Sequence, residues 1–245
     1  MPDPQHFEQN VEAYERGRPP YPAALFDRLA VLGLLVPGHR ALDVGAGTGL
    51  ATGPLLDAGL RVTAVEPGPR LASALAARHP EAAVIVGSAE SAELCDAAFD
   101  LAVAATSIHW LDLDVVLPAL HRALKPGGSL LVWRTVFGDP DAPVTPFRER
   151  VFSIVAERPD PVEDRDPLGQ DELLARIARD GLFSLRHFEL FRWSIELDEL
   201  HVRDLFATFS DWSPAEADAA AAAAQELGGL VTEHYVTPLA VFARV

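Results

Sequence analysis

The residues whose types and spacing could do chemistry form a glycine-rich turn in the first quarter of the chain. Gly45, Gly47 and Gly49 occupy alternate positions directly after an apolar run at 41–44, which only Asp43 interrupts. Glycine has no Cβ, so a ligand can approach the backbone of such a turn closely. We expect the apolar run to be a buried parallel strand that ends in a ligand-binding turn.

An acid follows at the end of the next predicted strand. The apolar run at 62–65 ends on Glu66. A glycine-rich first turn with an acid at the second strand end is typical of nucleoside-like cofactor sites in doubly wound sheets. The dinucleotide fingerprint is Gly-x-Gly-x-x-Gly, whereas this chain has Gly-x-Gly-x-Gly. Asp43 would sit badly beside a diphosphate, but it suits a ligand that carries an ammonium or a sulfonium.

The ordered set of strand, Asp43, glycine turn, helix, strand and Glu66 resembles motif I of the class I S-adenosylmethionine-dependent methyltransferases. This resemblance extends over residues 40–136. It implies S-adenosyl-L-methionine as the cofactor and S-adenosyl-L-homocysteine as the product.

Further motifs are similar to those of the small-molecule enzymes of the trans-aconitate methyltransferase-like group. They are a Tyr-x-x-x-Arg-Pro-x-Tyr-Pro segment at 14–22, a Gly-x-Ala-Glu at 87–90, the pair His109 and Trp110, and a Tyr-Val-Thr-Pro-Leu segment at 235–239. Together they span nearly the whole chain.

The resemblance implies a role for each residue near the cofactor. Asp43 would face the α-ammonium, or would instead cap the glycine turn, and Glu66 would accept both ribose hydroxyls. Ala89 and Glu90 would edge the adenine. Many relatives carry an aspartate where this chain has Ser88, which leaves Glu90 as the alternative acid for the adenine amino group. The predicted cofactor-binding residues are Asp43, Gly45, Ala46, Gly47, Glu66, Pro67, Ser88, Ala89, Glu90, Thr106, Tyr14 and Arg18.

The acceptor side offers one general base. An imidazole titrates in the right range to remove a proton from an acceptor, so His109 could serve as the base. Alternatively, His109 and Trp110 could form a wall over the cofactor. Tyr21 could close over the site as part of a lid, and Arg134 or Arg18 could meet a substrate carboxylate through the planar guanidinium. The predicted substrate-binding residues are Tyr21, Trp110 and Arg134. Thr106 and Ser107 either contact a ligand at the end of their strand or satisfy a local backbone group.

The elements that must position these residues alternate regularly. Five strands with intervening helices predict a parallel sheet, and two later strands predict an antiparallel hairpin at its edge. We expect a turn at 125–128, where the sequence is Lys-Pro-Gly-Gly. The fold is predicted to be α/β, with a Rossmann-like, seven-stranded, mostly parallel sheet and helices on both faces. The predicted strands are 41–44, 62–65, 83–86, 99–105, 129–136, 185–197 and 235–245.

The chain is predicted to be a single methyltransferase domain over 1–245. It would consist of an N-terminal helical lid at 1–39, a cofactor-binding core at 40–137, a helical cap with the sixth strand at 138–232, and the final strand at 233–245.

Composition limits the class of partner. The 245 residues carry a net charge of −16, which argues against nucleic acid because its binding depends on basic surface. One cysteine excludes an internal disulfide and fits a reducing cytoplasm. No run approaches the roughly 18 apolar residues of a membrane span. The eight histidines show no metal-ligand spacing. We therefore expect a cytoplasmic monomer or homodimer with a small-molecule substrate, no metal and no membrane contact.

The expected function is S-adenosylmethionine-dependent O-methylation of a small carboxylate or hydroxyl, with nitrogen or sulfur as other acceptors. The main alternative binds the same cofactor without methyl transfer, as a cyclase-like or regulatory protein. A macromolecular methyltransferase is disfavoured by the net charge, and a nicotinamide oxidoreductase is disfavoured by the glycine spacing.

Overall fold

The computed structural model describes residue 8 and residues 11–158 and 169–245. Residues 1–7, 9 and 10 of the predicted lid and residues 159–168 of the predicted cap lie outside the described residues. The described residues divide into two compact units. The core unit comprises those within 21–135, 166–191 and 237–245, and the accessory unit comprises those within 1–20, 136–165 and 192–236.

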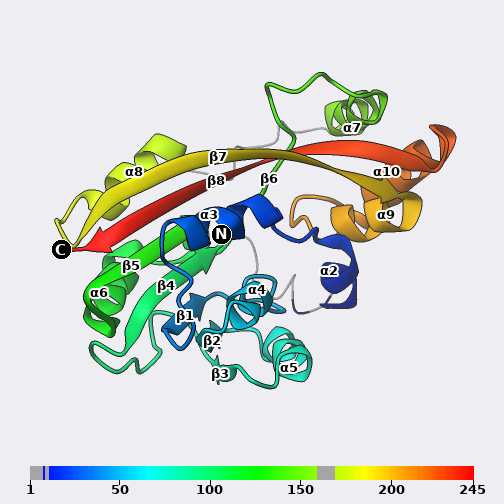
Figure 1. Cartoon of the computed structure of the whole chain (residues 1–245). Helices are drawn as coiled ribbons and strands as arrows, with labels where there is room; N and C mark the ends of the chain where they lie inside the picture. The colour runs from blue at the N-terminus through cyan, green and yellow to red at the C-terminus, as the bar shows by residue number, and fades with distance from the viewer. Residues whose placement is uncertain (1–7, 9–10, 159–168) are drawn as a thin grey trace. The chain divides into compact units, whose positions relative to one another are not determined.

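A parallel sheet forms the centre of the core unit (Figure 1). Its strands are β1 (Arg40–Val44), β2 (Arg61–Glu66), β3 (Ala83–Val86), β4 (Phe99–Ala105) and β5 (Leu124–Trp133). They lie in the order β3-β2-β1-β4-β5, and each pairs with its neighbours in parallel. The chain order reverses between β1 and β4, the position at which open α/β sheets bind ligands at the carboxyl ends of their strands.

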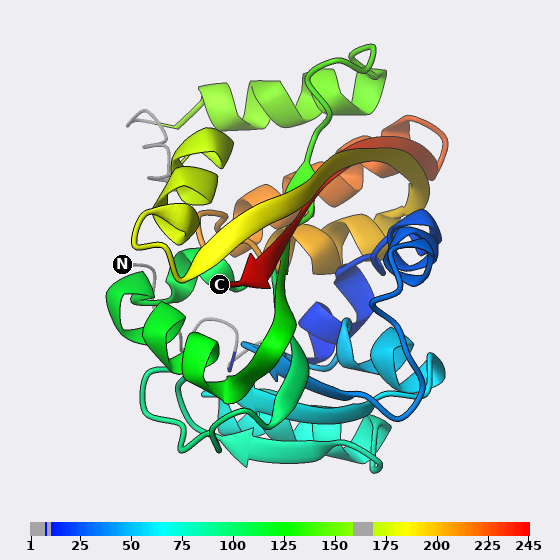
Figure 2. The ribbon, with the colours of Figure 1, turned by 60° about the vertical axis from the view of Figure 1, so that its left-hand side comes forward.

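Helices cover both faces of this sheet (Figure 2). One face packs against α3 (Ala23–Val31) and α4 (Thr52–Asp57), and the other packs against α6 (Leu113–Ala123) and α8 (Gln170–Ala178). A further helix, α5 (Pro69–Arg78), contacts β2 and β3.

Strand alternation explains why both faces are apolar. Leu101 and Val103 of β4 face the α3 and α4 side, whereas Ala102 and Ala104 face the α6 and α8 side. All four side chains are fully buried or nearly so, as expected for a parallel strand covered on both sides. The predicted Rossmann-like α/β fold is confirmed.

Two long strands complete the sheet. β7 (Phe183–Asp198) pairs with β8 (Leu230–Arg244), and residues 239–243 of β8 run antiparallel to β5. The predicted antiparallel edge is therefore present. The sheet has eight strands rather than seven, because β6 (Val136–Phe137) pairs with Val236 and Tyr235 of β8. Two residues are too few to give a periodic sequence signal.

The prediction of a separate turn at 125–128 is wrong, because these residues lie within a strand. These residues belong to β5 and form an irregularity within it, because the β4 pairing moves from Phe99–Leu124 directly to Leu101–Ser129. Gly127, with φ of 77°, allows the chain to bulge there. The proline and glycine residues therefore indicate a bulge within β5 and not a boundary of the strand.

The accessory unit is built mainly from helices. They are α2 (Val11–Gly17), α7 (Pro146–Ala156), α9 (Glu199–Ala207) and α10 (Pro214–Glu226). A Cβ on Gly17 would lie 2.4 Å from the backbone of Asp204, so glycine lets α2 approach α9 closely. The apolar core of the unit contains Phe147, Val151, Leu197, Val202, Leu205, Phe206, Ala217, Ala220, Ala224 and Val231.

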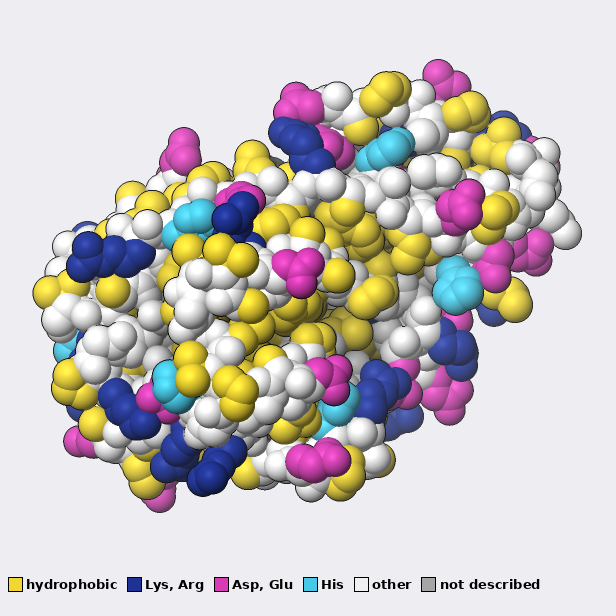
Figure 3. Space-filling view, in the orientation of Figure 1, with side chains coloured by type: hydrophobic (Ala, Val, Ile, Leu, Met, Phe, Trp, Pro, Cys, Tyr) yellow, Lys and Arg dark blue, Asp and Glu magenta, His cyan; other side chains and the backbone are white. Residues whose placement is uncertain are grey.

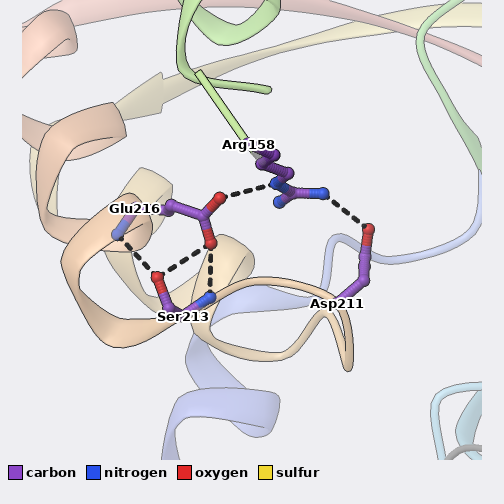
Figure 4. A network of polar contacts seen from close by, with 4 residues as sticks. All are labelled: Arg158, Asp211, Ser213 and Glu216. Atoms are coloured by element: carbon purple, nitrogen blue, oxygen red, sulfur yellow. Dashed lines mark hydrogen bonds and ion pairs between the residues drawn. The ribbon is translucent and has the colours of Figure 1, made fainter. Parts of the chain in front are cut away.

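A polar network joins the end of α7 to the start of α10 (Figure 4). Arg158 Nε donates to Glu216 Oε1 at 2.6 Å, and Arg158 also pairs with Asp211 at 3.4 Å. Ser213 and Glu216 form a capping box, in which each side chain accepts from the backbone N–H of the other. Ser213 is thus the N-cap of the alanine-rich α10.

The surface mixes charges of both signs. Figure 3 shows Lys and Arg side chains interspersed with Asp and Glu side chains on the face drawn. Among the described helices, none has both the length and the apolar character needed to cross a bilayer.

Candidate active site

The glycine turn follows the carboxyl end of β1. Gly45, Gly47 and Gly49 have φ values of 66°, 58° and 93°, which favour glycine. A Cβ on Gly45 would also lie 2.6 Å from the Cβ of Ser107. The sequence suggested close approach by a ligand as the reason for glycine. The structure adds an intramolecular reason at Gly45, which packs against the chain after β4.

Asp43 is fully buried at the end of β1. Its Oδ2 accepts a hydrogen bond of 2.6 Å from Thr52 Oγ1. Its Oδ1 has no hydrogen-bond partner among the described residues. Burial raises the pKa of Asp43 from 3.8 to about 6, and the nearby charge of Glu66 acts in the same direction. A buried acceptor without a donor is costly, so this oxygen suits a ligand that brings one.

Glu66 fastens the glycine turn to the end of β2. It is 5% exposed. Its Oε2 accepts from Gly47 N at 2.8 Å, and its Oε1 accepts from Gly68 N at 2.9 Å. Glu66 is therefore not a solvated strand end. It orients the turn whose backbone would approach the cofactor.

The loop after β3 holds the residues predicted to edge the adenine. Ala89 is buried, and Ser88 Oγ lies 3.0 Å from Ser91 Oγ. Glu90 Oε1 accepts from Asp112 N at 3.0 Å, which ties this loop to the start of α6. A Cβ on Gly87 would meet nothing within 4 Å, so there is open space beside this loop. Pro67, predicted at the cofactor, is exposed.

Thr106 occupies a strained position just after β4. Its φ of 57° lies in the left-handed region, which β-branched residues rarely adopt. Its Oγ1 lies 3.0 Å from the Tyr21 hydroxyl and accepts a long hydrogen bond of 3.4 Å from Thr135 N. Tyr21 in turn packs edge-on against Trp133, with the ring centroids 5.6 Å apart. The structure thus brings together Tyr21 and Thr106, which are predicted for the acceptor and the cofactor.

Ser107, expected together with Thr106 at the end of β4, touches the glycine turn directly. Its Oγ donates to Val44 O at 2.5 Å, and its Cβ fills the space that Gly45 leaves open. Because parallel β1 and β4 are neighbours, the residues after β4 necessarily meet the turn after β1. The hydroxyl of Ser107 thus satisfies a backbone carbonyl, which is the second of the two roles expected for it.

His109 and Trp110 lie in a short 3-10 helix, η1 (Ile108–Trp110). The His109 side chain is exposed, and the two ring centroids are 4.9 Å apart at an interplanar angle of 43°. Arg134 follows β5 and is half-buried. The roles of His109 as base or wall, and of Trp110 and Arg134 at the acceptor, stay predictions.

Tyr14 and Arg18 belong to the accessory unit. The Arg18 guanidinium carbon lies 5.4 Å from the Tyr14 ring centroid and 4.9 Å from that of Phe209, and Arg18 NH2 donates to Thr208 O at 3.2 Å. The contacts of Tyr14 and Arg18 with the cofactor or a substrate stay predictions. In the part of the chain that the structure describes, no three His, Cys, Asp or Glu side chains gather as a metal site would require.

Comparison with known proteins adds an independent finding. Residues 42–132 match the family described as a methyltransferase domain. This segment contains β1 to β5 almost in full, together with the glycine turn, Glu66 and Thr106.

Individual relatives agree with this match. The chain is 40% identical over 160 residues, 65% of its length, to an uncharacterized methyltransferase of Mycobacterium tuberculosis, of which it spans 62%. A solved structure assigned as a type II methyltransferase from Anaeromyxobacter dehalogenans superposes with a TM-score of 0.66 at 26% identity, covering 93% of this chain and 97% of the other.

A more distant structure shows the same fold with ligands bound. It is a phosphoethanolamine N-methyltransferase from Haemonchus contortus in complex with phosphomonomethylethanolamine and S-adenosylhomocysteine, with a TM-score of 0.58 at 18% identity over 98% of this chain and 58% of the other. The sheet order, the glycine turn and the matched segment agree: residues 42–132 match a methyltransferase domain, and the chain has the Rossmann-like fold of solved methyltransferases.

Proposed function

We propose that the chain is an S-adenosylmethionine-dependent methyltransferase of the trans-aconitate methyltransferase-like group, and that it methylates an oxygen of a small carboxylate or hydroxyl compound. The observation that carries this proposal is the pair of acids at the glycine turn. Asp43 offers a buried oxygen without a donor, and Glu66 fixes the turn beside it. The chain spans about 62% of the length of the curated mycobacterial relatives that it matches.

The two acids fit the cofactor in different ways. The free Oδ1 of Asp43 would accept from the α-ammonium of S-adenosylmethionine, and the carboxylate is ionised above its pKa of about 6. Each oxygen of Glu66 already accepts one backbone N–H. Glu66 would also accept from the two ribose hydroxyls, beside the turn that it holds. Ala89 and the open space beside Gly87 would receive the adenine.

When bound, S-adenosylmethionine supplies a methyl group made electrophilic by the sulfonium. The chain then has to align the acceptor and exclude water. Tyr21 and Thr106, whose hydroxyls lie 3.0 Å apart after β4, would orient the acceptor oxygen. A carboxylate acceptor needs no base and could pair with Arg134, whereas a hydroxyl acceptor would lose its proton to His109.

The remaining predictions concern the setting in which the enzyme works. The single cysteine, Cys95, is exposed and fits a reducing cytoplasm. The net charge of −16 supports a small-molecule substrate over nucleic acid. We propose a monomer or a homodimer, since either state is consistent with a cytoplasmic location and a small-molecule substrate.

Calorimetry and methyl transfer test the proposal in sequence. S-adenosylhomocysteine should bind in preference to NADH, and labelled S-adenosylmethionine should then transfer its methyl group to a member of a panel of small acids, phenols and amines. Preferential binding of NADH would refute the proposed cofactor. Tight binding of S-adenosylhomocysteine without transfer to any compound would favour the alternative of a binding protein without methyl transfer.

A further inference from the structure

The accessory unit contains a cavity whose lining shares no residue with the proposed methyl-transfer site. It has a volume of about 280 Å³ and lies between the loop after β6, the first turns of α7 and one stretch of β8. Figure 2 shows the chain passing from β6 through this loop into α7. Phe137, Val144 and Phe152 supply apolar walls. Ligand cavities in proteins start at roughly this size, so a small molecule would fit.

An ion pair forms the polar part of the lining. Glu233, 1% exposed, accepts through Oε1 from the Arg148 guanidinium and from His234 N. The Arg148 guanidinium carbon also lies 3.9 Å from the Phe137 ring centroid. The other oxygen, Glu233 Oε2, has no hydrogen-bond partner among the described residues. A buried carboxylate oxygen in this position lacks a donor, and burial raises the pKa of Glu233 accordingly.

The charges of the lining are balanced before any ligand enters. Glu233 pairs with Arg148, and Asp139, the second acid of the lining, pairs with Arg192. A charged ligand would therefore be buried without a counterion, which is costly. A neutral ligand avoids that cost and can still donate to Glu233 Oε2.

We propose that this cavity binds a neutral, mostly apolar small molecule, of the size of one aromatic ring, that donates one O–H or N–H to Glu233. The ring would pack against Phe137 and Phe152, and the donor would satisfy the free carboxylate oxygen. Binding at this cavity is independent of whether the chain transfers methyl groups.

Phenol and anisole test the need for a donor directly. Phenol has an O–H group that can donate, whereas anisole has a methyl group in place of that hydrogen. Protein-observed NMR titration should give phenol an affinity about 10-fold or more above that of anisole. In Glu233→Gln the amide oxygen stays with Arg148, so the amide N–H₂ replaces the free acceptor and phenol should lose this advantage. Equal affinities in the natural protein, or an unchanged preference in a folded Glu233→Gln variant, would overturn the proposal.

A second variant keeps the test independent of the ion pair. Val144 lines the cavity and is 57% exposed, so Val144→Trp should fill the cavity and weaken phenol binding at least about 10-fold without disturbing Glu233. Val31→Trp, at a residue of α3 that is 76% exposed and outside the lining, is the matched control and should bind phenol normally. Unchanged binding in Val144→Trp, or tighter binding of benzylamine or benzoate than of phenol, would contradict a site for a neutral donor.

Discussion

Asp43 ties stability and ligand binding to pH through one buried carboxyl. Its pKa is about 6 in the folded chain, against 3.8 for the free side chain. The folded state therefore favours the protonated form. The stabilisation this provides is complete below about pH 4 and is lost as pH rises through 6, a change of about 3 kcal/mol. The ionised form is nonetheless the one that would accept from an ammonium group.

We therefore expect S-adenosylhomocysteine to bind up to about 10-fold more tightly at pH 7 than at pH 5, because the ionised fraction of Asp43 rises over that interval. The Asp43→Asn variant should bind S-adenosylhomocysteine weakly at both pH values, because its amide would present N–H groups where the ligand needs an acceptor. Calorimetric titrations at the two pH values measure both effects. A pH-independent affinity in the natural protein would remove Asp43 from the ammonium site.

Although Glu66 is largely buried, we expect it to contribute strongly to the affinity for S-adenosylhomocysteine. Glu66→Gln has one oxygen for the two backbone N–H groups that the carboxylate now accepts. Hydrogen bonds to a charged group are worth roughly 1.5–3 kcal/mol, so we expect S-adenosylhomocysteine affinity to fall by about 10-fold or more. Glu81→Gln, at an exposed acid before β3, is the matched control. Equal affinities of the two variants would contradict the ribose contact.

The sequence predicts the acids of the site better than it predicts their contacts. Asp43 and Glu66 lie at the carboxyl ends of apolar strands, so their place at the ligand-binding end of the sheet was predictable. The backbone hydrogen bonds of Glu66 depend on how the turn folds, which residue types alone do not reveal. The positive φ of Thr106 was equally hidden, because threonine disfavours that conformation.

At the level of elements, Gly45 joins the turn after β1 to the chain after β4. Gly45→Ala would place a Cβ 2.6 Å from that of Ser107, in addition to the strain of its φ. Gly33→Ala has nearly the same φ, 71°, and meets nothing within 4 Å, so it isolates the strain, about 1–2 kcal/mol. Urea denaturation should show Gly45→Ala to be less stable than Gly33→Ala by about 1–3 kcal/mol. Equal losses would mean that Ser107 moves aside freely.

The capping box of α10 offers a test within the accessory unit. Ser213→Ala removes the side chain that accepts from Glu216 N, and should lower the free energy of unfolding by about 1 kcal/mol. Ser153, inside α7, only donates to the carbonyl of Glu149, so Ser153→Ala should be neutral or slightly stabilising. Thermal denaturation of the two variants distinguishes a cap from an ordinary helical serine. Loss of stability in both would argue against the cap.

The elements themselves were largely predictable. Apolar runs bounded by glycine, proline and acids located seven of the strands, with the ends of each within five residues of those observed. The bulge at Gly127 and the strand β6 were not predictable, because both arise from pairing with β4 and β8 rather than from periodicity within the segment. Local pattern thus predicts which segments are strands, and pairing decides where each begins.

For the whole molecule, the net charge of −16 leads to a prediction about partners. Nucleic acid binding requires basic side chains to displace counterions. We therefore expect no shift of duplex DNA or of structured RNA in native gels at low salt, where such binding is strongest. A salt-sensitive shift would contradict a small-molecule substrate and reopen the case for a macromolecular acceptor.

The last strand also sets the order in which the chain can fold during synthesis. β8 supplies residues to both units, pairing with β5 in one and with β6 in the other. Residue 230 follows the end of β5 by almost one hundred positions, so the ribosome delivers this strand long after its partners. Until then the edges of β5 and β6 lack their native partner, which exposes the nascent chain to edge-to-edge aggregation.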